Sequence, residues 1–488
     1  MEKLPTTLYQ THQVREFDRR TIQDLNIPGI DLMSRAGSVV FNCIRTQWPE
    51  TRSIAVFCGS GNNAGDGYII ARLALEAGLN VIVYSLANLE KITGDALIAY
   101  QHYSQAKGVV IPFQGRPLNE GIDVVVDALL GTGLDRPVTG LYELAINVIN
   151  ESPVHVIAVD NPSGLNANTG TVMNCAIKAD TTVTFIALKQ GLFTGKAADY
   201  CGEIVYSSLG VPESVFEGVL PTAIRVVKSS LLRRERCSHK GHYGHVLIIG
   251  GDHGYSGAAR LAGEAALRVG AGLVSIATRL EHAGVMNINR PELMCHGVAS
   301  AKQLLPLLEK ASVVVIGPGL GQSTWAMELF SQTLMAKKPL IIDADGLNLL
   351  AQFPQTNPDW ILTPHPGEAA RLLSPSTADI QEDRFAAAVA LQAKYQGIAV
   401  LKGSGTLICS GEEIAVSTSG NPGMASGGMG DVLSGVIGGL VAQGLSLKNA
   451  AQQGVYGHGK AADLAVELLG ERGLLASDLM PYLRQWVN

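Results

Sequence analysis

Three short polar stretches in the first half of the sequence combine carboxylates, amides and glycines. They are residues 59–67, residues 127–137 and residues 160–164. Free backbone N–H groups in a glycine-rich turn that opens a helix form a cradle for an anion. A tight turn would by itself explain glycine and asparagine in the first stretch. The adjacent Asn62 and Asn63, together with Asp66, exceed what a turn needs and predict a binding site.

The same stretches offer oxygen ligands. Asn63, Asp127 and Ser163 could supply one charged and several neutral oxygens, a set that suits a hard cation of low charge better than zinc. Asp127 or Asp160 could instead cap a helix, which is a common role after a strand. Three such loops at neighbouring strand ends favour a site.

The second half carries a denser glycine cluster in residues 421–435, which leads directly into an apolar helix. The N–H groups of residues 428–430 would face a ligand at that helix start and act as an oxyanion hole. Asp431 follows at once and is placed to accept a proton from a substrate hydroxyl while the amides hold a phosphoryl group. The alternative is that a helix start favours an aspartate for its dipole alone.

Four further polar loops follow strands in the second half: residues 317–321, 343–346, 363–368 and 402–406. His365 lies between two prolines, which favours a rigid ligand contact over a core histidine. The loop at residues 402–406 joins two strands and is either a simple hairpin or a phosphate-contacting loop.

Short β-branched runs alternate with amphipathic stretches, which is typical of a parallel sheet with crossover helices. The first series is expected at residues 53–58, 81–84, 123–127, 154–160 and 181–186, with a helix at residues 68–77. The second is expected at residues 245–249, 273–277, 312–316, 339–343, 360–363, 398–402 and 406–409. The first glycine spacing is not GxGxxG and no acidic residue ends the next strand, which disfavours a redox NAD-binding domain.

The chain has 488 residues, enough for two or three domains, and we expect one boundary near residue 225, giving domains 1–225 and 226–488. Charged residues make up 16%, the net charge is -6, and no long basic run is present, which disfavours nucleic acid as a partner. The seven cysteines form no CxxC pair, which fits a reducing cytosol. No apolar run approaches the ~20 residues that span a membrane, and no export signal is visible at the start.

Residues 61–67, 127–133 and 160–164 together resemble the YjeF N-terminal family of NAD(P)H-hydrate epimerases, with Ala64 where that family usually has glycine. The resemblance implies a Rossmann-like three-layer α/β/α domain and potassium bound through Asn63, Asp127 and Ser163. It implies a substrate held by Asn62, Asn63, Ala64, Gly65, Asp66, Gly131, Thr132, Gly133, Leu134, Asp135, Arg136, Pro137 and Asp160.

Residues 250–251, 317–319, 343–345, 363–368, 402–403 and 427–431 resemble, in family order, the ribokinase-like YjeF C-terminal family of ADP- or ATP-dependent NAD(P)H-hydrate dehydratases. The resemblance implies a ribokinase-like α/β domain that uses ADP, or ATP, with Mg²⁺. The implied contacts to the hydrated nucleotide are Ala258, Gly319, His365 and Asp431. The implied contacts to ADP are Lys402, Gly403, Ser404, Gly405, Thr406 and Gly430.

The two resemblances lead to one functional hypothesis for the chain. The first domain interconverts the R and S forms of hydrated NADH or NADPH, with Asp160 as its acid/base group, and the second dehydrates the S form, with Asp431 as base. We expect a cytoplasmic homo-oligomer. One alternative is a small-molecule kinase of the vitamin or sugar type with a regulatory first domain. Another is a first domain that only binds RNA or protein.

Overall fold

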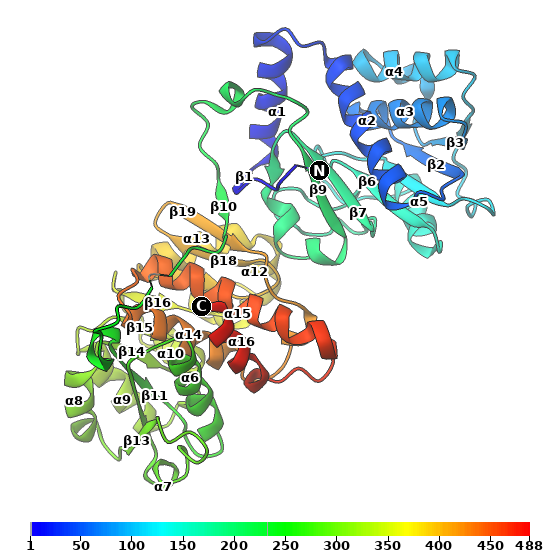
Figure 1. The fold of residues 1–488 in the computed structure, drawn as a ribbon. Helices are drawn as coiled ribbons and strands as arrows, with labels where there is room; N and C mark the ends of the chain where they lie inside the picture. The colour runs from blue at the N-terminus through cyan, green and yellow to red at the C-terminus, as the bar shows by residue number, and fades with distance from the viewer. Residues whose placement is uncertain (1, 232) are drawn as a thin grey trace. The chain divides into compact units, whose positions relative to one another are not determined.

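The computed structural model describes residues 2–231 and 233–488 and divides into two compact units, Met1–Ala223 and Ile224–Asn488 (Figure 1). None of the described helices is long and apolar enough to cross a membrane.

The first unit is built on a fully parallel sheet in the order β4-β3-β2-β5-β6-β7-β9. Its strands are β2 (Ser53–Cys58), β3 (Asn80–Ser85), β4 (Val110–Pro112), β5 (Val124–Ala128), β6 (His155–Val159), β7 (Thr181–Phe185) and β9 (Glu203–Ser207); β1 (Thr7–Tyr9) pairs with β8 (Leu188–Lys189). Its longer helices are α1 (Thr11–Arg19), continued by the π-helix η1 (Arg20–Asp24), α2 (Gly29–Gln47), α3 (Asn62–Glu76), α4 (Gly94–Gln105) and α5 (Leu141–Glu151).

Helices cover both faces of this sheet. Ile54 and Val56 of β2 point into a core with α2, α3 and α4, whereas Ala55 and Phe57 point into a core with α5. Side chains of a strand alternate between faces, so nearly every residue of β2 is buried. This arrangement confirms the predicted three-layer α/β/α unit.

The second unit has strands in the order β13-β12-β11-β14-β15-β16-β17-β18-β19, with β10 beside β19. The strands are β10 (Ala223–Arg225), β11 (His245–Ile249), β12 (Leu273–Thr278), β13 (Met294–Gly297), β14 (Val313–Ile316), β15 (Leu340–Ile342), β16 (Trp360–Leu362), β17 (Ile398–Leu401), β18 (Thr406–Ser410) and β19 (Glu413–Ser417). Pairing is parallel from β13 to β17 and antiparallel from β17 to β19. The predicted α/β class is therefore confirmed in this unit as well.

The helices of the second unit also lie on two faces of its sheet. They are α6 (Ser256–Arg268), α7 (Leu280–Ala283), α8 (Ala301–Lys310), α9 (Thr324–Leu334), α10 (Ala344–Gln352), α11 (Pro366–Leu373), α12 (Thr377–Glu382), α13 (Arg384–Tyr395), α14 (Met429–Ala442), α15 (Leu447–Leu469) and α16 (Leu479–Trp486). The helices α6, α14, α15 and α16 share one core with β11 and β14, and α8 packs with α9 on the other side (Figure 1).

In both sheets the order in which the chain adds strands reverses at one point. The chain proceeds from β2 outward to β3 on one side and continues with β5 on the other, and β11 is flanked by β12 and β14 in the same way. A crevice opens at the carboxyl ends of the two strands where the order reverses, and ligands of open α/β sheets bind there. The polar stretches singled out in the sequence follow these strands.

Candidate functional sites

The first unit has a cavity of about 580 Å³ at the strand ends where its order reverses. Ser60 and Gly61 after β2, Leu129 and Leu130 after β5, and Asp160 after β6 all line it. The three polar stretches predicted to form one site therefore do converge.

Most of the residues expected to hold substrate in this unit line the cavity. These are Asn62, Asn63, Asp66, Gly131, Thr132, Gly133, Leu134, Asp135, Arg136 and Asp160. Ala64, Gly65 and Pro137 are not part of this lining, and Ala64 and Gly65 are buried.

The helix after β2 begins earlier than the sequence predicts. We expected a turn up to Gly67 and a helix from residue 68, but α3 starts at Asn62. A Cβ atom at Gly65 would lie 2.5 Å from Met33 Sδ, and one at Gly67 would lie 2.7 Å from the Ala128 Cβ. These glycines therefore permit close packing of the first turns of α3, and the prediction of a long turn was wrong because it assigned them to backbone flexibility.

Asp127 and Ser163 form a buried pair beneath the cavity. The Ser163 hydroxyl donates to Asp127 Oδ1 over 2.6 Å, and the Ser163 N–H donates to Oδ2 over 2.8 Å. Burial raises the pKa of Asp127 to about 6, against the effect of the hydrogen bonds from Ser163 and from the Leu129 N–H. Ser163 and Leu129 are neutral hydrogen-bond donors, so neither of them balances the negative charge of Asp127. Asp127 does not cap a helix, since Gly140 precedes α5.

Asn63 lies at the rim of the cavity against Gly131, where a Cβ atom would be 3.5 Å from the Asn63 Cβ. The amide nitrogen of Asn63 is buried and has no hydrogen-bond partner among the described residues. The two ends of an amide are assigned by their hydrogen bonds. Rotating this amide by half a turn would place its oxygen at the position that lacks a hydrogen bond. Oxygen is the atom through which an amide side chain binds a hard cation.

Asp160 is held by a lysine that the sequence analysis missed. Lys189 is 1% exposed and forms an ion pair with Asp160 Oδ1. The Lys189 ammonium also donates to the Thr184 hydroxyl over 3.0 Å and to the Phe185 carbonyl over 3.3 Å. Asp160 itself has a φ of 68°, an uncommon conformation outside glycine that points to a local constraint at a functional site. Helix capping is excluded as the role of this carboxylate.

Two more charged groups enter the cavity from α1, which was not part of the predicted site. Arg15 and Asp18 line the cavity. Burial, and after it the charge of Asp160, raises the pKa of Asp18 to about 6. Burial and the charges of Asp160 and Asp18 raise the pKa of Asp66 well above its usual range.

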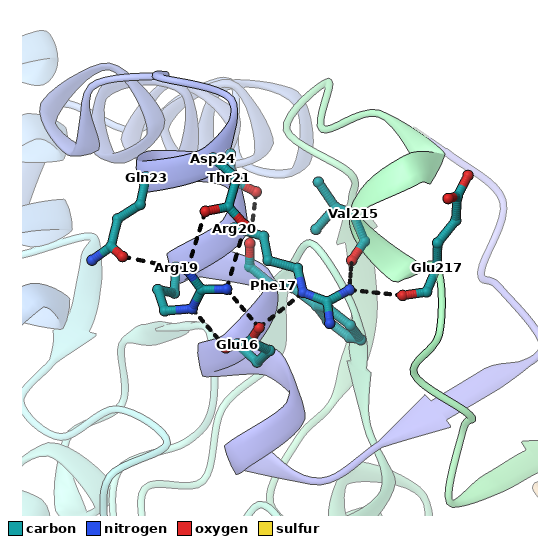
Figure 2. A network of polar contacts seen from close by, with 9 residues as sticks. All are labelled: Glu16, Phe17, Arg19, Arg20, Thr21, Gln23, Asp24, Val215 and Glu217. Carbon is teal, nitrogen blue, oxygen red and sulfur yellow. Dashed lines mark hydrogen bonds and ion pairs between the residues drawn. The ribbon is translucent and has the colours of Figure 1, made fainter.

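A polar network on the other side of α1 fixes this helix, and we call it the α1 clamp. The clamp consists of Glu16, Arg19, Arg20 and Asp24 with the carbonyls of Val215 and Glu217 (Figure 2). Arg20 donates to those two carbonyls over 2.9 and 2.8 Å, and Arg19 and Arg20 lower the pKa of Glu16 to about 2. The helix that carries Asp18 is thus tied to a segment far away in the sequence.

The second unit also brings its polar loops together where its strand order reverses. The Gly251 N–H donates to the Pro318 carbonyl over 3.0 Å, which joins the loops after β11 and β14. A Cβ atom at Gly319, whose φ is 57°, would lie 3.1 Å from the Ala258 Cβ and 2.6 Å from the Tyr255 carbonyl. The predicted substrate contacts Ala258 and Gly319 are therefore neighbours.

Lys402 lies at the centre of a carboxylate cluster. Its ammonium is 2.9 Å from Asp343 Oδ1 and 3.8 Å from Glu368 Oε2. Burial alone would lower the pKa of Lys402, but the charges of Asp343 and Glu368 outweigh it and raise the pKa. A Cβ atom at Gly430 would lie 3.2 Å from the Lys402 ammonium, so the glycine-rich start of α14 touches this cluster.

Asp431 is in the first turn of α14, after Gly428 in the left-handed conformation. Burial, and then the carboxylate of Asp343, raises the pKa of Asp431 to about 7, against the effect of Lys402. A carboxyl group with a pKa near the working pH is suited to proton transfer. A preference for the helix dipole alone does not explain this cluster of acids.

The loop that carries Lys402 is stiffened by Arg384, a second residue that the sequence analysis missed. Arg384 is 1% exposed and donates to the carbonyls of Leu401 and Lys402 over 3.2 and 3.3 Å. A Cβ atom at Gly403 would lie 2.8 Å from this guanidinium, whereas Gly403 and Ser404 are exposed on the other side. The loop is a hairpin between antiparallel β17 and β18.

His365 is half exposed at the start of α11, beside the same cluster. Its Nδ1 accepts from the Gly367 N–H over 3.0 Å, and its Nε2 lies 3.5 Å from Glu368 Oε1. Burial, and then the charges of Lys402 and Arg371, lowers the pKa of His365. The histidine caps the helix and remains accessible to a ligand, and it is not a core residue.

Each half of the chain matches a known protein family. Residues 29–191 match a family model described as YjeF-related protein N-terminus, and residues 246–485 match one described as NAD(P)H-hydrate dehydratase. A solved structure of the ADP/ATP-dependent NAD(P)H-hydrate dehydratase from Bacillus subtilis is 32% identical, covers 52% of this chain and 93% of that chain, and has a TM-score of 0.49.

Two full-length relatives carry the same name. The bifunctional NAD(P)H-hydrate repair enzyme Nnr of Coxiella burnetii is 52% identical and covers 99% of this chain and 100% of its own length. The Escherichia coli enzyme of that name is 43% identical and covers 99% of this chain and 95% of its own length. The chain belongs to the family of bifunctional NAD(P)H-hydrate repair enzymes.

Proposed function

We propose that this chain repairs hydrated NADH and NADPH in two steps, with residues 1–225 interconverting the R and S epimers and residues 226–488 dehydrating the S form at the expense of ADP. The observation that carries the proposal is the similarity to bifunctional relatives over the whole chain. Two polar sites, one in each unit, support it. Joining the activities is useful because only one epimer fits the dehydratase, so the other would otherwise accumulate.

In the epimerase unit the substrate is held by the glycine-rich loop and by the start of α3. Asp160 is its acid/base group, because it lines the cavity and is oriented by Lys189. A hydrogen bond or proton transfer at the C6 hydroxyl needs such a carboxyl within reach. Asp127, which competes with Asp160 for this role, is fully buried and does not line the cavity, so it is poorly placed to exchange protons with a ligand.

The residues present fit a potassium ion, which would be held by Asn63, Asp127 and Ser163. Asp127 is a buried carboxylate with neutral partners from Ser163 and Leu129, and a bound cation would offset its charge. The orphaned amide position of Asn63 supports the same assignment. When bound, the ion would supply a fixed positive charge beneath the loop that cradles substrate.

The potassium assignment has a direct test. Epimerisation should be supported by potassium and lost when a bulky organic cation replaces it. Anomalous scattering from thallium, a heavy substitute for potassium, should place an ion between Asn63, Asp127 and Ser163. Unchanged epimerisation in the organic cation, together with no ion at that position, would exclude the assignment.

In the dehydratase unit Ala258, Gly319, His365 and Asp431 contact the hydrated nucleotide. The hairpin residues 402–406 and Gly430 contact ADP, which is supported by the exposure of Gly403 and Ser404 and by the proximity of Gly430 to Lys402. Asp431 accepts the proton of the C6 hydroxyl while the N–H groups at the start of α14 stabilise the transferring phosphoryl group. Phosphoryl transfer from ADP, which leaves as AMP, turns the C6 hydroxyl into a good leaving group. Loss of phosphate from C6 and of a proton from C5 then restores the C5–C6 double bond of the reduced nicotinamide.

Magnesium fits only as an ion that arrives with the nucleotide. No group of three or more His, Cys, Asp or Glu residues in the part of the chain that the structure describes could hold a metal ion by itself. Magnesium in such sites is typically held by one or two carboxylates together with phosphate oxygens and water. The ion would neutralise phosphate charge near Asp343 and Glu368.

One assay tests the two activities together. A mixture of both hydrate epimers is incubated with the full chain, with and without ADP, and recovery of reduced nicotinamide is followed by absorbance. Full recovery that depends on ADP supports the proposal. Release of a phosphorylated product without NADH or NADPH would instead show a small-molecule kinase.

The cellular location and the oligomeric state are proposed from the sequence. A cytosolic location is supported by the seven cysteines, all of which are free thiols in the structure. A homo-oligomeric state stays a prediction.

A further inference from the structure

One carboxyl group of the epimerase cavity has no role in the proposed function. Asp18 lines the same cavity as Asp160 but comes from α1, whereas Asp160 follows the carboxyl end of β6, an inner strand of the sheet. The two groups are close enough for their charges to interact. A ligand in this cavity therefore meets carboxyl groups from two separate elements.

The position of Asp18 is fixed by the packing of its helix. Phe17, its neighbour, is fully buried and packs against Tyr9 and Phe216 with ring centroids 5.0 and 4.7 Å apart. The α1 clamp holds the other side of the helix (Figure 2). The π-helix η1 follows directly, and such π segments are frequent at functional sites. Asp18 is thus a positioned group.

Inversion at C6 is a reversible ring opening when written with balanced protons. The hydroxyl proton passes to a carboxylate, the electron pair of the C6–N1 bond moves to N1, N1 takes a proton, and C6 becomes an aldehyde carbon. Rotation about the C5–C6 bond presents the other face. N1 then attacks C6 and releases its proton, while the oxygen takes a proton from a carboxyl group. No electrons are gained or lost overall.

This sequence requires proton exchange on both faces of the ring. The hydroxyl of one epimer lies on the opposite face from the hydroxyl of the other, so a single fixed carboxyl cannot reach both. We propose that Asp18 is a second catalytic carboxyl of the epimerase site, which exchanges the C6 hydroxyl proton of one epimer while Asp160 exchanges that of the other. This inference rests on the proposed epimerase function.

The other acids of the cavity are less suited to this role. Burial, and then the charges of Asp160 and Asp18, raises the pKa of Asp66 well above its usual range, so the charged form of this group is disfavoured. Asp95 lies against Gly29 at the start of α2, and Asp135 is exposed. A pKa of about 6 allows Asp18 to exchange protons in both directions near neutral pH.

The test compares Asp18→Asn with His12→Gln, a control at an exposed position of the same helix that belongs neither to the α1 clamp nor to the cavity lining. Interconversion of pure R and pure S hydrate is followed by chromatography without ADP. We expect Asp18→Asn to lower epimerisation above the spontaneous rate by about 10²-fold or more. His12→Gln should stay within about threefold, and both variants should dehydrate S hydrate with ADP at the wild-type rate.

A second variant separates chemistry from folding. Asp18→Glu keeps a carboxyl group, so its epimerisation rate should be at least about tenfold higher than that of Asp18→Asn. Hydrogen exchange of β2 and β6 should be no faster than in the wild type in all three variants. Near-normal epimerisation in Asp18→Asn, an equal loss in His12→Gln, or no recovery in Asp18→Glu would each overturn the role of Asp18. Absence of epimerisation in the wild type would instead refute the proposed function.

Discussion

The two units each place a lysine among carboxyl groups, fully buried in the first unit and partly buried in the second. Lys189 pairs with Asp160 in the first, and Lys402 pairs with Asp343 in the second. In each site another acid is left with a raised pKa. Each lysine thus pairs with one carboxylate, while burial raises the pKa of another acid in the same site.

The units differ in how the lysine and its acids are held. Lys189 donates to the neighbouring Thr184 and Phe185, and the cavity receives Asp18 from a helix at the start of the chain. Lys402 lies on a hairpin supported from beneath by Arg384, and its acids follow consecutive strands. A cavity lined by strand ends and by a helix from the start of the chain can present acids to both faces of a ring. An open hairpin suits a site that must admit a nucleotide.

The largest effect should come from removing the lysine of the second unit. Lys402→Met leaves Asp343 and Glu368 buried without their counter-charge, so we expect loss of dehydration and a destabilisation of that unit by about 3–5 kcal/mol. Lys189→Met should have the matching effect on epimerisation only. Separate assays of each activity, with urea unfolding of the full chain, would measure both. Loss of both activities in either variant would break the comparison.

The next effect is chemical. Asp431→Asn should reduce dehydration by about 10²–10⁴-fold because an amide cannot accept the hydroxyl proton. Epimerisation should be unchanged, because the acid belongs to the other unit. The measurement is ADP-dependent recovery of NADH from pure S hydrate, beside R to S conversion without ADP. A variant that still dehydrates normally would remove Asp431 from the reaction.

Asp18 should cost stability in the folded protein. Its pKa is about 6 in the fold against about 3.9 in an unfolded chain, so the free energy of unfolding falls as pH rises from about 4 to about 6 and stays lower above. Asp18→Asn removes this cost and should stabilise the first unit by up to about 3 kcal/mol at pH 8 and hardly at all below pH 4. Urea unfolding read by hydrogen exchange of β2 and β6 would show it. Destabilisation at pH 8 would contradict the account.

The smallest expected difference lies in the pH profiles. Asp431 must be ionised to accept a proton, so kcat/KM of dehydration should fall as pH drops through about 7. The kcat/KM of epimerisation should fall in the same way near pH 6, where Asp18 takes up its proton. Both pH profiles can be recorded on one preparation. A fall at the same pH for both activities would show that the acids of the two units do not have different pKa values.

Much of the fold was predictable because buried parallel strands have continuous apolar runs. β2 and β11 have the predicted bounds, and the other predicted strands differ by a few end residues. The strands missed were β1, β4, β8, β9, β10, β13 and β19. Most of them have two to four residues, and β9 and β19 each begin with an exposed or half-buried glutamate. Hydrophobic periodicity is weak where one end of a strand faces solvent.

The candidate sites were only partly predictable. Residues at strand ends, such as Asp160 and Asp431, could be named because sheet topology alone gathers those ends. Asp18, Lys189 and Arg384 could not, because each reaches its site through tertiary packing and none lies in a glycine-rich motif. Lys189 looks like an ordinary surface lysine in the sequence, and only its burial beside Asp160 indicates its role.

The central claim is that one chain repairs both epimers through two separate sites. Asp160→Asn given a mixture of both epimers with ADP tests it most directly. We predict rapid recovery of the S fraction as NADH at the wild-type rate, followed by recovery of the R fraction only at the spontaneous rate of epimerisation. Recovery of the whole mixture at the wild-type rate would contradict the account.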